Sequence, residues 1–346
     1  NPKHPPRDYQ MDGFVHAIRS KRKVIISPTG SGKSLLQYMI FMYLLKKGKR
    51  GLLIVPRAAL VEQMYSDFGD YSSKNGKDMS KYCHRVYAGK DKDVDMPLII
   101  STWQSLQNLP KDYFKRFDYV IVDEVHGAVE KSQNMKVMSN IVTNCVNAEY
   151  RIGVTGTLPK GPGADFSLTG LFGDIYKVIS SKELMDRKQL ADLTIKCLLL
   201  KYSEEECQYM KSVDYKAEIE YIISNKERNK FIRNLALSLE GNTIVFFNYV
   251  EKHGQVLYDM IKAKVKDGRK VFYIHGGTDV DDREQVRKIL EQESNAILVG
   301  SIGVLSTGTN IVALDNVIFA SPSKSKVRNL QSIGRGLRTS STKRSA

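Results

Sequence analysis

A glycine-rich segment at residues 27–34, Ser-Pro-Thr-Gly-Ser-Gly-Lys-Ser, combines the residue types that bind phosphate groups. Its glycines let successive backbone N–H groups converge on an anion without steric clashes from a Cβ atom. The usual pattern of such a loop begins with glycine, whereas this chain has Ser27. A plain Gly/Ser-rich turn with a solvated lysine is therefore the alternative interpretation. The residues expected to contact a nucleotide or its Mg²⁺ ion are Thr29, Gly30, Ser31, Gly32, Lys33 and Ser34.

Lys33 and Ser34 have separate tasks in this interpretation. The Lys33 ammonium would reach the β- and γ-phosphates of ATP, and the Ser34 hydroxyl would hold Mg²⁺. Residues 35–45 are long enough for a helix, whose N-terminus would add unpaired N–H donors. Upstream, the amide of Gln10 can both donate and accept, which suits an adenine edge; an ordinary surface glutamine is the alternative.

Two adjacent carboxylates, Asp123 and Glu124, directly follow the apolar run at residues 119–122. A nucleotide hydrolase needs an acid that holds Mg²⁺ and a group that orients and deprotonates the attacking water. We therefore assign Asp123 to the metal and Glu124 to the water. A solvated acidic loop is the alternative.

Three further polar residues follow the ends of apolar runs. His126 either bonds across to a second domain or satisfies only local structure. Thr155 and Thr157 either relay between sites or cap the next segment, and we favour the relay.

A basic segment at residues 331–338, Gln-Ser-Ile-Gly-Arg-Gly-Leu-Arg, is the third group with a recognisable chemistry. Arg335 and Arg338 are three residues apart, which puts them on one face if the segment is helical. Guanidinium groups suit the charge that develops on a transferring phosphoryl group. The alternative is a basic surface that binds nucleic-acid phosphates or is merely solvated.

The elements that must position these residues are strands and helices that alternate regularly along the chain. Continuous apolar runs alternate with helix-length segments, which predicts a parallel sheet with helices on both faces. Ligands of such sheets bind beyond the carboxyl ends of the strands, where all the groups of the first half fall. The strands expected in this half are residues 24–26, 51–55, 98–101, 119–122 and 151–154.

This alternation returns in the second half, without a second phosphate loop. We expect a domain boundary between residues 181 and 182, so that the domains are 1–181 and 182–346. Residues 203–239 have a helical composition, with Ser203 as the N-cap. Further helices are expected at residues 250–265 and 281–293. Strands are expected at 195–200, 243–247, 271–277, which ends in a glycine turn, 296–301 and 316–320.

Composition narrows the class of protein. The chain has 346 residues, and 53 Lys and Arg against 38 Asp and Glu give a net charge of +15, which favours polyanionic partners. Its four cysteines form no CxxC pair, which predicts reduced thiols in a cytoplasmic protein. No apolar run approaches the roughly 20 residues that span a bilayer. Because the chain begins with Asn1, we expect a fragment or a processed form.

Taken together and in order, these segments resemble the motifs of superfamily 2 helicases of the DExH type. The resemblance extends from about residue 7 to residue 338. It covers Gln10 and residues 27–34, 56–60, 101–104, 123–126, 155–157, 246–252, 306–310 and 331–338.

The resemblance implies two RecA-like domains that sandwich ATP and Mg²⁺. Gly308 would contact the nucleotide, while Gln331, Arg335 and Arg338 of the second domain would complete the catalytic site. Trp103 would either stack on a base or belong to the core. The residues implied to face a nucleic-acid backbone are Arg57, Thr102, His275, Gly276 and Ser301.

The function implied is that of a monomeric, ATP-dependent DNA helicase or translocase. Overall similarity favours a member that remodels branched DNA in recombination, repair and replication. An RNA helicase or a restriction-type translocase on double-stranded DNA is the alternative within the family. A non-enzymatic binder that uses the nucleotide as a switch is the alternative outside it, and the intact Asp123–Glu124 pair argues against that alternative.

Overall fold

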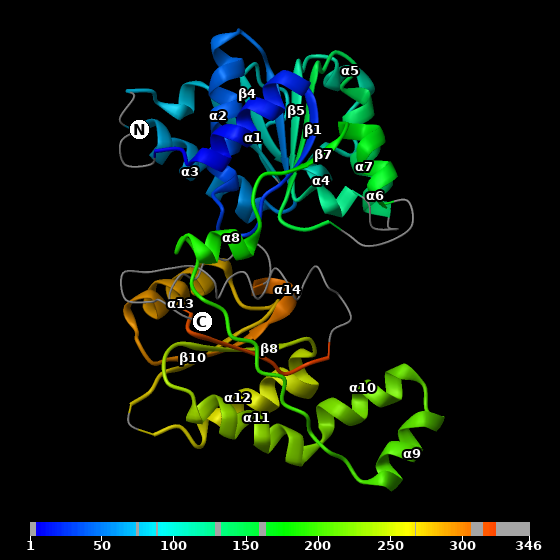
Figure 1. Ribbon diagram of the computed structural model, residues 1–346, viewed down its shortest axis with the longest axis vertical. Helices are drawn as coiled ribbons and strands as arrows, with labels where there is room; N and C mark the ends of the chain where they lie inside the picture. Colours follow the sequence, from blue (N-terminus) through cyan, green and yellow to red (C-terminus); the bar gives the residue numbers. More distant parts are fainter. Residues whose placement is uncertain are drawn as a thin grey trace. The chain divides into compact units, whose positions relative to one another are not determined.

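The computed structural model describes residues 5–73, 76–87, 89–128, 133–158, 164–266, 268–305 and 314–322. The chain divides into two compact units, Asn1–Leu184 (unit 1) and Met185–Ala346 (unit 2), and each is described by itself (Figure 1). Four residues singled out by the sequence lie outside the described residues, namely Gly308, Gln331, Arg335 and Arg338.

Unit 1 contains a seven-stranded sheet in the order β3-β4-β2-β5-β6-β1-β7, and all its described strand pairs are parallel. The five predicted strands are present. The short strands β3 and β7 at the two edges were not predicted, because polar residues interrupt their apolar pattern. The strands are β1 (Arg22–Ile26), β2 (Gly51–Val55), β3 (Cys83–Val86), β4 (Leu98–Thr102), β5 (Tyr119–Asp123), β6 (Tyr150–Thr155) and β7 (Ile175–Lys177).

Helices cover both faces of this sheet, as predicted (Figure 1). Neighbouring residues of a strand point to opposite faces, so Leu53 packs with α1, α2 and α3, whereas Leu52 packs with α4 to α7. The helices are α1 (Asp8–Ser20), α2 (Lys33–Lys46), α3 (Ala58–Ser72), α4 (Trp103–Leu106), α5 (Lys111–Phe114), α6 (Gln133–Asn144), α7 (Ala164–Phe172) and α8 (Ser181–Asp186), with 3₁₀ turns η2 (Met79–Lys81) and η3 (Val125–Ala128).

The described residues of unit 2 form a four-stranded parallel sheet in the order β11-β8-β10-β9. Helices α11 and α12 pack on the face that contains Val245, and α13 and α14 pack on the face that contains Ile244. The elements are α9 (Glu204–Ser212), α10 (Tyr215–Ser224), α11 (Lys226–Ser238), β8 (Thr243–Phe247), the π-helical turn η4 (Val250–Gln255), α12 (Val256–Lys262), β9 (Val271–Ile274), α13 (Val280–Gln292), β10 (Ile297–Ser301), α14 (Ile302–Leu305) and β11 (Asn316–Phe319).

The predicted strand at residues 195–200 is wrong. This segment has no regular secondary structure, and Leu199 is 91% exposed. An apolar run indicates a strand only where a neighbouring strand can pair with it, and no described strand does so here. The N-cap predicted at Ser203 is confirmed, because its hydroxyl accepts the backbone N–H of Glu206.

No helix in the described ranges is long and apolar enough to cross a membrane.

Candidate active site

The phosphate loop joins β1 to α2, and α2 begins at Lys33. Gly30 and Gly32 have φ angles of 83° and 80°, in the left-handed region that favours glycine. The departure at Ser27 is accommodated by hydrogen bonding. Its buried hydroxyl lies 2.6 Å from the Ser31 hydroxyl, which itself donates to the Pro28 carbonyl at 2.6 Å. Serine therefore replaces glycine without leaving an unsatisfied polar group.

Gln10 lies beside this loop, on α1. Its amide nitrogen donates to the carbonyls of Ser31 at 2.8 Å and Gly32 at 3.2 Å. Its amide oxygen accepts the backbone N–H of Arg7 at 2.9 Å. A Cβ atom on Gly32 would lie 2.4 Å from the Gln10 amide nitrogen, so glycine is needed there for space as well as for its φ angle. Gln10 thus braces the loop, and its contact with adenine is a proposal.

The predicted acid pair lies at the carboxyl end of β5, close to Lys33. Lys33 Nζ is 3.3 Å from Glu124 Oε1, and both side chains are less than one-fifth exposed. Glu124 has a φ angle of 48°, which is strained for a residue with a side chain. Asp123 is 8% exposed and is the last residue of the strand. The sheet thus brings together two segments that are about ninety residues apart in sequence.

The two carboxylates have opposite pKa shifts. Burial, followed by the negative charge of Glu124, raises the pKa of Asp123 to about 6. Burial also acts to raise the pKa of Glu124, but the nearby Lys33 ammonium and His126 outweigh it, so this pKa lies below its ordinary value. The site therefore contains one carboxylate that stays ionised and one whose negative charge is costly. A bound cation would stabilise the charge on Asp123.

His126 and the two threonines form a local network around Glu124. His126 Nδ1 lies 3.2 Å from Glu124 Oε2 and 3.0 Å from the Thr155 hydroxyl. The Thr155 hydroxyl donates to the Thr157 carbonyl at 2.8 Å, and the Thr157 N–H lies 3.3 Å from the Thr155 hydroxyl oxygen. The Thr157 hydroxyl is buried without a partner among the described residues. The relay role of the two threonines is a proposal.

Two residues of this cluster were missed by the sequence analysis. The Gln37 amide nitrogen donates to Asp123 Oδ1 at 2.9 Å, and the Ser34 and Tyr71 hydroxyls are 2.8 Å apart. Gln37 had a signal, because it interrupts an apolar run and follows Lys33 by one helical turn. Tyr71 had none, because it comes from the end of α3, far from Ser34 in sequence.

Three residues predicted to face nucleic acid lie after strands of unit 1. Arg57 is exposed and precedes α3 as its N-cap. Thr102 is buried at the end of β4, where its hydroxyl caps α4 by accepting the Ser105 N–H at 3.4 Å. Trp103 is half-buried and packs against the apolar cluster that covers one face of the sheet.

The other three lie at the carboxyl ends of strands of unit 2. His275 follows β9 and is half-buried, and its ring accepts the N–H of Gly277 at 3.1 Å. Gly276 is exposed, and its carbonyl accepts from Arg283 at 2.9 Å. Ser301 is buried at the end of β10. The binding roles of all six residues are proposals.

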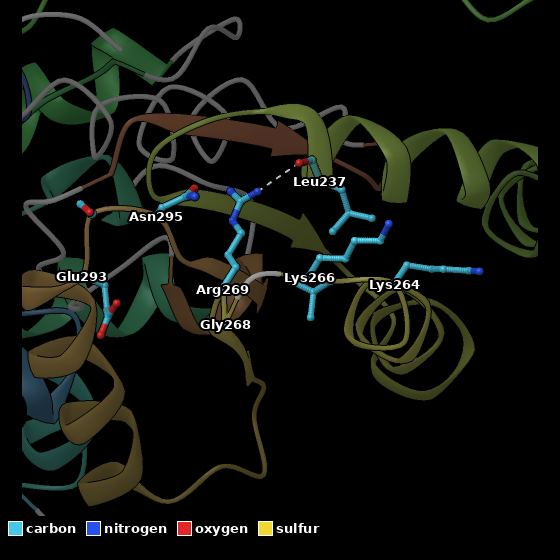
Figure 2. A pocket seen from close by; sticks show the side chains of 9 residues that line it. Leu237, Lys264, Lys266, Gly268, Arg269, Glu293 and Asn295 are labelled. Atoms are coloured by element: carbon cyan, nitrogen blue, oxygen red, sulfur yellow. Dashed lines mark hydrogen bonds between the residues drawn. The ribbon is translucent and has the colours of Figure 1, made fainter.

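Unit 2 has a cavity of about 440 Å³ near the amino-terminal ends of β9 and β10 (Figure 2). Arg269 points from its floor toward Leu237, whose carbonyl accepts a hydrogen bond at 3.2 Å, while Lys264 extends away (Figure 2). Arg269 also donates to the carbonyl of Gly241 at 3.1 Å. Because the guanidinium holds backbone carbonyls together, its role is structural. The lining of the cavity does not include His275, Gly276 or Ser301.

The residues of unit 1 fit a nucleotide and Mg²⁺. A Cβ atom on Gly156 would lie 3.3 Å from Lys33 Nζ and 3.5 Å from Thr29 N, so a side chain there would crowd the phosphate loop. Asp123 and Ser34 offer the hard oxygen ligands that Mg²⁺ prefers. No three His, Cys, Asp or Glu side chains gather into a metal site within the described ranges.

Comparisons with known proteins identify the family of this chain. Residues 3–160 match the family "Type III restriction enzyme, res subunit", and residues 226–340 match "Helicase conserved C-terminal domain". The chain is 34% identical over 98% of its length to the ATP-dependent DNA helicase uvsW of Enterobacteria phage T4, and spans 66% of that protein's length.

Two solved structures show the same fold at low identity. The helicase MrfA bound to DNA superposes with a TM-score of 0.70 at 16% identity, covering 96% of this chain and 47% of MrfA. The restriction-modification enzyme LlaBIII bound to DNA superposes with a TM-score of 0.69 at 19% identity, covering 99% of this chain and 27% of LlaBIII. The predicted fold of two RecA-like α/β domains is confirmed. The chain belongs to the superfamily 2 helicases, a family of enzymes that hydrolyse ATP.

Proposed function

We propose that this chain is an ATP- and Mg²⁺-dependent DNA helicase or translocase that remodels branched DNA. The observation that carries the proposal is the Lys33–Glu124 contact of 3.3 Å beside Asp123, at the carboxyl end of β5. It joins a phosphate-binding loop to the two carboxylates of a nucleotide hydrolase. The 34% identity to the T4 helicase supports DNA as the substrate.

The geometry supports a division of labour between the charged residues. Asp123 and Ser34 would hold Mg²⁺, which supplies charge neutralisation at the phosphates when it is bound. Lys33 can leave Glu124 to bind a phosphate. Glu124 then loses a stabilising positive charge and becomes a stronger base for the attacking water. His126, 3.2 Å from Glu124, would keep that carboxylate oriented.

Unit 2 would supply further residues for the reaction and would bind the nucleic acid along which the protein moves. We assign Arg335, Arg338 and Gln331 to the charge that develops during phosphoryl transfer, and Gly308 to the nucleotide. The net charge of +15 favours a polyanion. Contacts with the phosphate backbone carry no sequence preference, which suits a motor that moves along any sequence. We further propose that the protein acts as a monomer in the cytoplasm, which would be that of a host cell if the chain is of phage origin.

Phosphate release measured across a panel of nucleic acids tests the proposal. Branched DNA should stimulate release more than linear duplex, single strands or RNA do, and it should be converted to separated or migrated products. The Lys33→Ala variant should show neither activity, because it lacks the cation of the loop. Release that is equal with and without nucleic acid would contradict the proposal.

A second candidate has a specific observation in its favour, namely the match to the Type III restriction family. In that case linear duplex DNA would stimulate as well as branched DNA, and the protein would move along it without separating the strands. The displacement of a bound roadblock from a long linear duplex distinguishes the two functions. RNA as the strongest activator would instead indicate an RNA helicase.

A further inference from the structure

The hydroxyl of Ser34 has a dedicated partner that none of the roles above uses. Ser34 is the second residue of α2, and its Oγ lies 2.8 Å from the hydroxyl of Tyr71, in the last turn of α3. The Tyr71 ring lies 5.5 Å from the ring of Tyr38, also on α2. Packing between the two helices therefore holds the Tyr71 hydroxyl beside Ser34.

Each of the two side chains assigned to Mg²⁺ is hydrogen-bonded to a second side chain. Asp123 is held by the Gln37 amide at 2.9 Å, and Ser34 is held by Tyr71 at 2.8 Å. In metal sites, such partners orient the ligands and raise their affinity for the ion. A serine oxygen that offers a lone pair to a cation must direct its proton elsewhere. The oxygen of a neutral tyrosine hydroxyl is able to accept the hydrogen bond that this proton makes.

We propose that Tyr71 is a positioning residue for the divalent cation: its hydroxyl oxygen accepts a hydrogen bond from the Ser34 hydroxyl and thereby turns a Ser34 lone pair toward the ion. The inference rests on the proposed function, which places Mg²⁺ at Ser34.

Packing alone does not explain the hydrogen bond. A phenylalanine at position 71 would keep the ring contact with Tyr38 at 5.5 Å and bury the same ring. The hydroxyl, which phenylalanine lacks, is the group that reaches the serine assigned to the metal.

Binding of a fluorescent ATP analogue tests the inference without reference to turnover. The Tyr71→Phe variant keeps the ring and its packing but loses the hydroxyl. It should need about tenfold more Mg²⁺ for half-maximal binding, as is typical when an outer-shell partner is removed. Its binding of the analogue in EDTA should be unchanged, because the phosphate loop itself is intact.

Tyr65→Phe is the matched control on the same helix. The Tyr65 ring packs under Arg85, and its hydroxyl makes no hydrogen bond to a described residue. This variant should keep the wild-type Mg²⁺ requirement. Circular dichroism should show the same thermal midpoint, within a few degrees, for both variants. A Mg²⁺ requirement of Tyr71→Phe equal to that of Tyr65→Phe would overturn the inference.

A double-mutant cycle with Ser34→Ala separates positioning from a general effect. Once Ser34 lacks its hydroxyl, Tyr71→Phe should cause no further change in the Mg²⁺ requirement. The same tenfold effect in both backgrounds would show that Tyr71 acts by another route. If Mg²⁺ has no effect on nucleotide binding by the wild-type protein, the proposed metal site itself is contradicted. If the wild type and Tyr71→Phe need Mg²⁺ equally, only the role of Tyr71 is contradicted.

Discussion

The two units have the same kind of parallel sheet covered by helices on both faces, yet they bury different polar groups. At the carboxyl ends of its strands, unit 1 buries Asp123 and leaves less than one-fifth of the Lys33 and Glu124 side chains exposed. At the corresponding ends in unit 2, the buried polar side chains within the described ranges include Ser301, Ser321 and His253, and all three are neutral. Burying charge is costly, so the enclosed group of Asp123, Glu124 and Lys33 marks where chemistry is expected.

A buried histidine in unit 2 belongs to a hydrogen-bond network of a different kind. His253 is fully buried in η4, and its ring nitrogens lie 3.0 Å from the Ser321 hydroxyl and 3.2 Å from the Asn229 side-chain oxygen. Burial, followed by the nearby Arg228, lowers the pKa of His253 to about 4. This network joins α11, η4 and the segment after β11 with neutral groups only. The buried network of unit 2 therefore stabilises the fold, whereas the charged cluster of unit 1 suits catalysis.

The largest expected effect is on turnover. Glu124→Gln should lower nucleic-acid-stimulated phosphate release by about 10²- to 10⁴-fold, because it removes a general base. Glu293→Gln in unit 2 is the matched control, since its carboxylate bonds Lys270 at 2.6 Å on the opposite edge of that sheet. It should leave turnover unchanged. Similar losses in both variants would erase the functional contrast between the units.

The second effect is the pH dependence of stability in unit 2. The pKa of His253 is 6.5 in the unfolded chain and about 4 in the fold, so the folded state favours the neutral ring. The contribution of this neutral ring to the free energy of unfolding is fully present above pH 6.5 and is lost as the pH falls toward 4. The loss amounts to about 3 kcal/mol of unfolding free energy. His253→Gln should flatten this dependence.

Urea unfolding can assign that loss to unit 2. Trp103 is the only tryptophan of the chain and lies in unit 1, so its fluorescence follows unit 1 alone, whereas circular dichroism follows both units. Between pH 6.5 and 4, the wild-type protein should lose unfolding free energy in the transition followed by circular dichroism and not in the transition followed by fluorescence. The His253→Gln variant should not show this loss. A variant whose pH dependence matches the wild type would show that His253 does not stay neutral in the fold.

The smallest effects come from a pair of glycines. A Cβ atom on Gly254 of η4 would lie 2.5 Å from the Phe247 ring, so Gly254→Ala should destabilise unit 2 by about 1–3 kcal/mol. Gly69 on α3 has open space, so Gly69→Ala should stabilise unit 1 by about 0.5–1 kcal/mol. Urea unfolding measures both shifts. A Gly254→Ala variant that is as stable as the wild type would contradict the packing described for η4.

Much of the architecture could be predicted because its signals are local in sequence. Apolar runs identified five strands of unit 1, and a short spacing of Gly, Lys and Ser identified the loop before α2. The edge strands β3 and β7 were missed, since short strands with polar residues have no such signal. Residues 195–200 were wrongly expected to be a strand, because apolar character alone does not supply a pairing partner.

The amino-acid sequence by itself determined the inventory of the site: a phosphate loop with Lys33 and an acid pair, each directly after a buried strand. Only the tertiary structure decided which atoms meet. Sheet order and register bring Lys33 to Glu124, and the packing of α3 on α2 brings Tyr71 to Ser34. The physical reason is that a residue's type and its neighbours in sequence favour a local conformation. Contacts between distant segments depend instead on how the whole core packs.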